Sequence, residues 1–367
     1  MADTLSAIKN VALPKKARKS VNELLKSIYS YEGFRELEVY TNLFKNKDTV
    51  RISQGQLIES VIVAAEKATE LNADIDNVLL TAPTGAGKSL LFQLPAIYLG
   101  REYGLLTIVI SPLKALILDQ VESLQDMGYH KVAYASSDLS PEQKMEVYRQ
   151  VHEGEVDLFY LSPELLLSYD IKRFIGDRRL GLLVVDEAHT VTTWGKEFRV
   201  DYWFLGRYLK NIKSSLGYSF PIFALTATAI WNPEGSGDMV FETIKSLQME
   251  PCALYVGVVK RMNIGFDINQ LRVEEGETYD KAKQRVIADR VEDFLQDHKT
   301  IMYYPFAGGI DMKLKTWVKS VDWHLVSSIS RISTPIPKAF VATIILFVPS
   351  VNSLTIVAFS SLSFFQI

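Results

Sequence analysis

A short apolar run that leads into a glycine-containing turn constrains this chain more than any other feature. Residues 77–81, NVLLT, are typical of a buried strand, and Pro83, Gly85 and Gly87 interrupt the apolar pattern before a helix expected at 90–98. In this order of strand, turn and helix, the glycines let backbone N–H groups close around phosphate oxygens at the positive end of the helix. The segment therefore predicts a cradle for nucleotide phosphates.

The side chains of this turn fit the binding of a nucleotide together with its metal. The residues that we expect beside the phosphates are Thr84, Gly85, Ala86, Gly87, Lys88 and Ser89. We expect Lys88 to reach the β- and γ-phosphates and the Ser89 hydroxyl to hold Mg²⁺. Ala82 stands where the usual G-x-x-x-x-G-K-[ST] pattern has its first glycine, and a small residue there still permits the turn. The alternative is an ordinary connection between strand and helix that contains Lys-Ser by chance.

Length, charge and cysteine content limit the classes of protein that remain. A chain of 367 residues is long enough for two domains. Its 40 basic and 43 acidic residues give a net charge of −3, so any contact with nucleic acid has to be local. Cys252 is the only cysteine, which excludes internal disulfides and four-cysteine zinc sites and is compatible with a reducing cytosol. With no secretory signal in residues 1–20, we expect a cytoplasmic protein without zinc and without stable membrane association.

Strands and helices alternate along much of the chain. Further strands are expected at 105–110, at 131–135, just before Ser162, at 182–185 and at 221–225, and helices from 114, at 141–152 and at 238–247. This order predicts an α/β fold with a doubly wound parallel sheet and helices on both faces.

The first 40 residues are expected to form an N-terminal helical extension. The spacing of apolar residues in 21–40 suggests one or two amphipathic helices packed on the first domain. The basic cluster of Lys15, Lys16, Arg18 and Lys19 fits a solvated tail better than a contact with phosphates.

Arg51 and Gln54 precede an amphipathic helix about two dozen residues before the phosphate-binding strand. A glutamine amide both donates and accepts, which matches the N6 and N7 edge of adenine and favours ATP over GTP. Taken alone, the segment fits exposed helix positions at Gln54 and Gln56 equally well. We expect Arg51 and Gln54 to recognise adenine if the other motifs hold.

Two adjacent acids follow the apolar strand at 182–185 and lie where open α/β sheets bind ligands. Asp186 can hold the Mg²⁺ that Ser89 also contacts, and Glu187 can orient and deprotonate an attacking water. His189 is expected to couple the nucleotide state to the rest of the protein. A solvated acidic turn is the alternative.

Ser111 and Lys114 stand between an expected strand and the helix that follows it. A hydroxyl, a cation and free N–H groups at a helix N-terminus can together bind a backbone phosphate of a nucleic acid. A routine turn between strand and helix explains the same residues.

Five segments together resemble the first motor domain of a superfamily 2 helicase, namely APTGAGKS, SPLKALILDQ, LSPELL, DEAH and LTATA. The RecQ type is the most similar, because its pattern DEAHCISQWGHDFRPEY corresponds to DEAHTVTTWGKEFRVDY in this chain. The resemblance implies a RecA-like P-loop NTPase domain in which Trp194, Phe198, Arg199 and Tyr202 belong to a loop that senses single-stranded DNA. Aromatic rings and a guanidinium there can stack on bases and attract the backbone. Packing of Trp194 and Phe198 in the core is the alternative.

The same resemblance assigns two further segments. Thr226 and Thr228 fall on a turn that links the nucleotide site to the nucleic-acid track, although two hydroxyls at a strand end also fit an ordinary turn. Arg51 and Gln54 correspond to the F-R-x-x-Q motif of the family, with Val50 in place of the aromatic residue.

Domain boundaries follow from the motifs and from where they stop. We expect an N-terminal extension at 1–40, a first RecA-like ATP-binding domain at 41–235, the incomplete start of a second RecA-like domain at 236–322, and a charge-poor tail at 323–367. The second domain is indicated by the resemblance of residues 261–266 to the family pattern R-x-N-[LI]-x-[FY]. Beyond Arg290 the only arginine is Arg331, which lacks the Q-x-x-G-R-x-x-R context of an arginine finger.

The tail admits three interpretations. It contains no acid from Trp323 onward and no charge after Lys338. A membrane helix is disfavoured by Pro349 and Ser350, which interrupt the apolar run. A packed β-rich segment fits the content of Val, Ile and Phe. We favour the third interpretation, a frame change or a truncated gene, because the charge disappears abruptly.

Two classes of function remain. The resemblance implies a RecQ-like ATP-dependent DNA helicase that couples Mg²⁺-ATP hydrolysis to 3′-to-5′ movement on single-stranded or forked DNA. The alternative is a module that binds nucleotide and DNA without efficient hydrolysis, which the missing arginine finger favours. An RNA helicase fits the aromatic loop less well.

Overall fold

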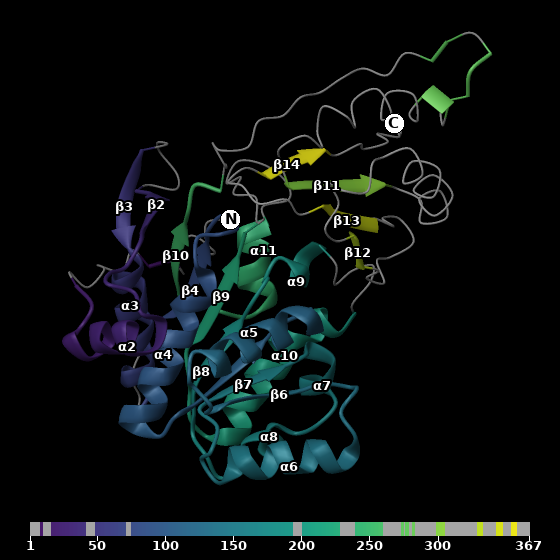
Figure 1. Ribbon diagram of the computed structural model, residues 1–367. Coiled ribbons are helices and arrows are strands. Elements are labelled where there is room, and N and C mark those ends of the chain that lie inside the picture. The colour runs from purple at the N-terminus through teal and green to yellow at the C-terminus, as the bar shows by residue number, and fades with distance from the viewer. Residues whose placement is uncertain are drawn as a thin grey trace. The chain divides into compact units, whose positions relative to one another are not determined.

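The computed structural model describes a first unit and part of a second one (Figure 1). The first unit comprises residues 1–263 and the second residues 264–367. The described residues are 8–9, 16–41, 48–70, 75–193, 200–227, 239–259, 273–274, 276–278, 281–282, 299–304, 329–332, 343–347 and 354–357.

A parallel sheet of eight strands forms the centre of the first unit. The strands are β1 (Ile8–Lys9), β4 (Asn77–Thr81), β5 (Leu106–Ile110), β6 (Val132–Ala135), β7 (Leu158–Leu161), β8 (Leu180–Val185), β9 (Ile222–Thr226) and β10 (Cys252–Val256). Their order across the sheet is β1-β10-β4-β9-β8-β5-β7-β6, and every neighbouring pair is parallel. Strands β4, β5, β7, β8 and β9 are buried along their whole length, as parallel strands covered on both faces are expected to be.

Helices cover both faces of this sheet, as the sequence predicts. The helices of the first unit are α2 (Lys19–Tyr29), α3 (Gln54–Lys67), α4 (Lys88–Tyr103), α5 (Lys114–Asp126), α6 (Pro141–His152), α7 (Pro163–Leu167), α8 (Ile171–Ile175), α9 (Thr190–Thr193), α10 (Val200–Leu216) and α11 (Met239–Ser246). Side chains alternate between two cores along each strand, so that Leu182 and Val184 pack with α2 to α5 while Leu183 and Val185 pack with α6 to α11. The expected α/β architecture is therefore confirmed.

Residues 21–40 form one helix and one strand, so the expectation of helices throughout is wrong. Helix α2 ends at Tyr29, and Ser30 takes the left-handed conformation of a C-cap. Strand β2 (Glu36–Tyr40) then pairs antiparallel with β3 (Thr49–Ser53). The physical reason is the alternation of exposed and buried residues along Glu36, Leu37, Glu38 and Val39, which is the period of a strand. This hairpin lies beside β10, where Val39 bridges Gly257 (Figure 1).

The first unit extends past residue 235, the boundary expected from the sequence. Helix α11 and strand β10 both follow that position, yet β10 pairs with β4 in the centre of the sheet and α11 contributes to the core. The resemblance at residues 261–266 lies outside the described residues.

Strands are the regular elements described in the second unit. They are β11 (Lys299–Tyr304), β12 (Ile329–Ile332), β13 (Thr343–Phe347) and β14 (Leu354–Val357), in the order β12-β13-β11-β14. Strand β11 is parallel to β14, and the other two pairs are antiparallel. Of the three interpretations of the tail, the β-rich segment is the one that matches these strands. Within the described part of the chain, no helix has the length and apolar character needed to span a bilayer.

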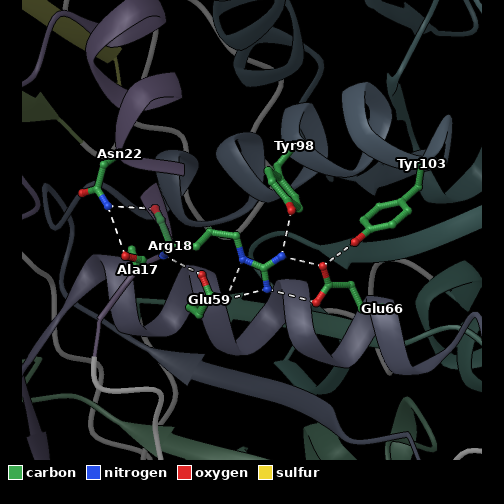
Figure 2. Close-up of polar contacts among 7 residues, drawn as sticks. All are labelled: Ala17, Arg18, Asn22, Glu59, Glu66, Tyr98 and Tyr103. Carbon is green, nitrogen blue, oxygen red and sulfur yellow. Dashed lines mark hydrogen bonds and ion pairs between the residues drawn. The ribbon is translucent and has the colours of Figure 1, made fainter. Parts of the chain in front are cut away.

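Arg18 ties the segment before α2 to α3 and α4 (Figure 2). Its Nε donates to Glu59 Oε1 at 2.7 Å, and its Nη1 donates to Glu66 Oε1 at 2.5 Å and to the Tyr98 hydroxyl at 2.7 Å. The Tyr103 hydroxyl donates to the same carboxylate of Glu66 at 2.7 Å. Arg18 is therefore a partly buried cross-link and not part of the solvated basic tail that the sequence suggested, a difference that arises because its acidic partners lie 41 and 48 residues away.

The charges of this cluster stabilise one another. The hydrogen bond to Glu66 raises the pKa of Arg18, although burial opposes it, and the same bond lowers the pKa of Glu66. The hydrogen bond to Glu66 also raises the pKa of Tyr103 to about 12. Because the Glu59 side chain is only 9% exposed, removal of Arg18 would leave a carboxylate in a site that water reaches poorly.

We predict that Arg18→Met lowers the free energy of unfolding by about 2–4 kcal/mol, the size expected when a largely buried ion pair loses one partner. Urea denaturation measures this loss. Lys26→Met is the control, because the Lys26–Glu32 pair is exposed and its loss should change the free energy of unfolding little. The double variant Arg18→Met with Glu66→Gln should lose less than the sum of the two single changes. Additive losses would contradict the cross-link.

Candidate nucleotide-binding site

Three neighbouring strands bring the expected motifs together. Strand β9 lies between β4 and β8, so the turn after β4, the acids after β8 and Thr226 at the end of β9 share one edge of the sheet. The Ala82 N–H donates to the Thr226 carbonyl at 2.9 Å, and the Ala188 N–H donates to the Leu225 carbonyl at 2.9 Å. This carboxyl edge is where open parallel sheets bind their ligands.

The turn between β4 and α4 has the backbone of an anion-binding loop. Gly85 and Gly87 have φ angles of +83° and +73°, which side chains other than glycine rarely adopt. Gly87 is the N-cap of α4. It has no side chain that could accept a hydrogen bond from the first N–H groups of the helix, so these groups point out of the helix end. Thr84 and Gly85 are exposed at the tip of the turn, and Ala86 is partly buried. The geometry fits phosphate oxygens.

Lys88 and Ser89 are the first two residues of α4. In this structure the Lys88 ammonium donates two long hydrogen bonds back to the turn, to the Ala82 carbonyl at 3.4 Å and to the Pro83 carbonyl at 3.5 Å. Its positive charge also interacts with Asp186 and Glu187. The ammonium therefore lies in the same site as the two acids, with hydrogen bonds weak enough to exchange for a phosphate.

Asp186 is 5% exposed and accepts a hydrogen bond from the Glu187 N–H at 2.9 Å. Burial raises the pKa of the Asp186 carboxyl to about 6, and the charge of Glu187 adds to this effect. Hydrogen bonds from the Glu187 backbone and the Gln120 side chain and the charge of Lys88 act in the opposite direction. A buried carboxylate of this kind gains stability from a bound cation.

Glu187 points to different partners from its neighbour. Its φ of +49° is the left-handed region, which turns the chain sharply after the strand. The His189 Nδ1 lies 3.3 Å from Glu187 Oε2 and 3.0 Å from Thr226 Oγ1. The hydrogen bond with His189 lowers the pKa of Glu187. His189 thus lies between the second acid and the end of β9.

Gln54 contacts the phosphate-binding turn directly. It is the first residue of α3, whose start is fixed by reciprocal hydrogen bonds between Ser53 and Gln56. The Gln54 Nε2 donates to the Ala86 carbonyl at 2.8 Å. With only 2% of its surface exposed, Gln54 is not the solvated helix residue that was the alternative.

Arg51 lies on the hairpin, and the described contacts do not bring it to this site. Its side chain is 77% exposed, with Nη1 3.8 Å from a Glu36 oxygen. Arg35 takes the place beside Gln54 instead: the Arg35 N–H donates to Gln54 Oε1 at 3.1 Å, and the Gln54 N–H donates to the Arg35 carbonyl at 2.9 Å. Phe34 packs so closely on Gly55 that a Cβ there would lie 2.6 Å from its ring.

Phe34 and Arg35 thus lie against the start of α3, although the β2–β3 hairpin separates them from Gln54 in the chain. Sequence reasoning missed this contact because no local spacing joins the two segments. The role of Arg51 in adenine recognition stays a prediction.

The residues expected to contact DNA are described only in part. Ser111 is fully buried and its hydroxyl has no hydrogen-bond partner among the described residues, so it does not present a surface group to a phosphate in this conformation. Lys114 is half exposed and forms an ion pair with Asp138. Thr226 is buried against His189. Outside the described residues lie Trp194, Phe198, Arg199 and Thr228, and the side chain of Tyr202 on α10 is likewise not described.

The sequence of the chain is similar to those of known helicases. Residues 61–235 match the DEAD/DEAH box helicase family. The chain is 36% identical over 200 residues to the protein of Saccharomyces cerevisiae named ATP-dependent helicase SGS1, an alignment that covers 53% of this chain and 13% of that protein. It is 31% identical over 247 residues to the protein of Haemophilus influenzae named ATP-dependent DNA helicase RecQ, covering 67% and 33%.

Among solved structures, the crystal structure of the DUF1998 helicase MrfA matches with a TM-score of 0.53 at 19% identity. The match covers 84% of this chain and 42% of that one, and it supports the fold alone. The chain thus spans less than half the length of each of these three proteins.

We predict that Asp186→Asn stabilises the metal-free protein at pH 8 by an amount of the order of 2 kcal/mol. The folded pKa of about 6 lies above the unfolded value, so the wild type loses stability as pH rises from about 4 to 6 and stays at the lower level above that. Asparagine cannot ionise, so the advantage of the variant should vanish below about pH 4. Urea denaturation with a metal chelator at several pH values measures it.

Asp119→Asn, at an exposed position on α5, is the matched control and should change stability little at any pH. If Asp186→Asn is less stable than the wild type at pH 8, the ionised carboxylate does not lower the free energy of unfolding, and the prediction is wrong.

Proposed function

We propose that the chain is a RecQ-like superfamily 2 helicase that binds Mg²⁺-ATP at the carboxyl edge of its parallel sheet and couples hydrolysis to movement along DNA. The observation that supports this most is the convergence at one sheet edge of an open phosphate-binding turn, a lysine, two acids and His189. Each group has the chemistry that phosphoryl transfer requires.

The residues at the sheet edge fit a magnesium nucleotide. In the proposed complex, N–H groups from Thr84 to Ser89 bind phosphate oxygens, and the Lys88 ammonium exchanges its carbonyl partners for the β- and γ-phosphates. The Ser89 hydroxyl and the Asp186 carboxylate are the oxygen ligands that Mg²⁺ prefers. Mg²⁺, when bound, neutralises charge that develops on the phosphates. Burial of the Asp186 carboxyl, which raises its pKa, supports its role as the metal ligand, because a bound cation would offset the cost of the buried charge.

Glu187 is the proposed acceptor of a proton from the attacking water. Its lowered pKa keeps the carboxylate ionised at neutral pH, so it can orient a water and accept its proton. His189 holds this carboxylate and contacts Thr226 as well, which gives a physical connection from the hydrolytic acid to the turn after β9. We infer that this connection passes the nucleotide state towards the DNA side of the domain.

Gln54 is the proposed reader of adenine. Its amide uses one N–H for the Ala86 carbonyl and one lone pair for the Arg35 N–H, and the remaining N–H and lone pair match the N6 and N7 edge. The Arg35 backbone bonds to Gln54, and the Phe34 ring packs on Gly55, so both residues help to hold the segment that carries Gln54.

DNA is the proposed track, because the relatives from H. influenzae and S. cerevisiae are named a DNA helicase and a helicase. The loop that contains Trp194, Phe198, Arg199 and Tyr202 is the proposed sensor of single-stranded DNA, with 3′-to-5′ polarity following from the resemblance to the RecQ type. A nucleotide- and DNA-binding module without efficient hydrolysis remains the second candidate, because no arginine after Arg290 has the context of an arginine finger.

We predict that the purified chain hydrolyses ATP with Mg²⁺ and that single-stranded DNA stimulates turnover. Glu187→Gln should lower turnover by about 10²–10⁴-fold while nucleotide still binds, because the variant cannot accept a proton. Lys88→Ala should lose nucleotide binding and keep its fold. A steady-state ATPase assay, a fluorescent-nucleotide titration and circular dichroism measure the three properties. Binding without turnover in the wild type would favour the binding module, and absence of nucleotide binding would contradict both candidates.

For the DNA response we predict that Trp194→Ala keeps basal ATP turnover and loses most of the stimulation by single-stranded DNA, since a stacking surface for bases is removed. The ratio of turnover with and without an oligonucleotide measures this. Tyr169→Ala removes an exposed aromatic ring elsewhere and is the control. Unchanged stimulation in Trp194→Ala would assign that residue to core packing.

A further inference from the structure

Four uncharged side chains form a continuous hydrogen-bonded chain that leads from α2 to Asp186. The Tyr29 hydroxyl donates to Gln93 Oε1 at 3.0 Å, and Gln93 Nε2 donates to the Tyr160 hydroxyl at 3.1 Å. The Tyr160 hydroxyl donates to Gln120 Oε1 at 3.1 Å, and the Gln120 side chain is in turn a hydrogen-bond partner of the Asp186 carboxylate. The members come from α2, α4, β7 and α5, which are distant in sequence.

The inner members of this chain have no access to water. Gln93 is 4% exposed and Tyr160 is completely buried between α4 and α5. A polar group in such a place is costly unless its hydrogen bonds are made, so each of the two must keep its partners. Each buried member therefore fixes the orientation of the next one.

The direction of the chain follows from its end at Asp186. A carboxylate accepts hydrogen bonds and has none to donate, so the Gln120 amide must present its NH₂ group to Asp186 and its oxygen to Tyr160. Tyr160 then has to donate to Gln120, which leaves its lone pair for the NH₂ group of Gln93. The three hydrogen bonds among Tyr29, Gln93, Tyr160 and Gln120 all have this polarity. Hydrogen bonds aligned in one direction polarise one another and strengthen the chain.

We propose that Gln120 is a positioning residue that holds the Asp186 carboxylate in the orientation that binds Mg²⁺, and that Tyr29, Gln93 and Tyr160 fix the Gln120 amide for this purpose. The proposal rests on the proposed function as an ATPase, and it gives a role at the site to a residue for which the sequence had suggested none. Partners that orient a ligating side chain commonly decide the metal affinity of a site.

The place of Gln120 in the fold gives this contact a second consequence. Gln120 lies on α5, whose first residue is Lys114, one of the residues expected to contact nucleic acid. Any displacement of α5 at Lys114 would therefore also displace the Gln120 amide, which lies in the middle of the same helix.

The first test separates metal-dependent from metal-independent nucleotide binding. A fluorescent ATP analogue is titrated with chelator and at a series of free Mg²⁺ concentrations. Gln120→Ala should bind the analogue as the wild type does without metal, and should need about three- to tenfold more Mg²⁺ for half-maximal gain in affinity, the effect of one neutral hydrogen bond. Tyr160→Phe should shift the Mg²⁺ dependence in the same direction by a smaller factor.

Gln125→Ala is the matched control, because it makes the same change on the same helix at an exposed position. Its Mg²⁺ dependence should equal that of the wild type. A Gln120→Ala variant that loses affinity equally with and without metal would show a merely structural role, and unchanged Mg²⁺ dependence would overturn the proposal.

A second measurement needs neither nucleotide nor metal. The midpoints of urea unfolding are compared for Gln120→Ala, Asp186→Ala and the double variant in the presence of chelator. Contact between the two side chains predicts that Gln120→Ala shifts the midpoint less in the Asp186→Ala background than in the wild type. Additive shifts would overturn the proposal. If the wild type binds no nucleotide, the proposed function fails, and this arm still decides whether Gln120 positions Asp186.

Discussion

The position of β9 between β4 and β8 is the constraint on which the candidate site depends. The five central strands are buried on both faces, so ionisable groups can reach water only where these strands end. The Ala82 and Ala188 N–H groups bond to consecutive carbonyls of β9, at Thr226 and Leu225. The phosphate-binding turn and the acidic turn are thereby fixed to the same strand, and their separation cannot change without breaking the sheet.

The surroundings of Asp186 and Glu187 shift the pKa values of the two carboxyls in opposite directions. Burial and the neighbouring charge raise the pKa of Asp186, while His189 lowers the pKa of Glu187. The left-handed backbone of Glu187 makes this division possible, because it turns consecutive side chains to different partners. One carboxylate then suits a cation and the other a water molecule, and paired groups with opposite pKa shifts are the usual arrangement where acid and base roles are divided.

The sequence predicted those parts of the molecule that depend on local pattern. The phosphate-binding turn, the central strands and the acids are each defined by a few consecutive residues, and the structure has them where they were expected. The contact of Phe34 and Arg35 with the start of α3 was missed because the β2–β3 hairpin separates them in the chain. Gln120 ends the segment SPLKALILDQ, but its contacts with Tyr160 and Asp186 join residues that are distant in sequence, so no spacing could give it a role.

The support of the site begins well before the residues that match the helicase family. Helices α3 and α4 run side by side in the same direction, with Gln54 against Ala86 at their first turns and Glu66 against Tyr103 at their last ones. Arg18 joins the two helices beyond their midpoint, and the hydrogen-bonded chain to Asp186 starts on α2. Both networks therefore depend on residues ahead of position 61, where the family match starts. The folding unit that shapes the nucleotide site includes α2 and the hairpin, and a fragment cut at the family boundary would lack Gln54 itself and the Tyr29 hydroxyl that bonds to Gln93.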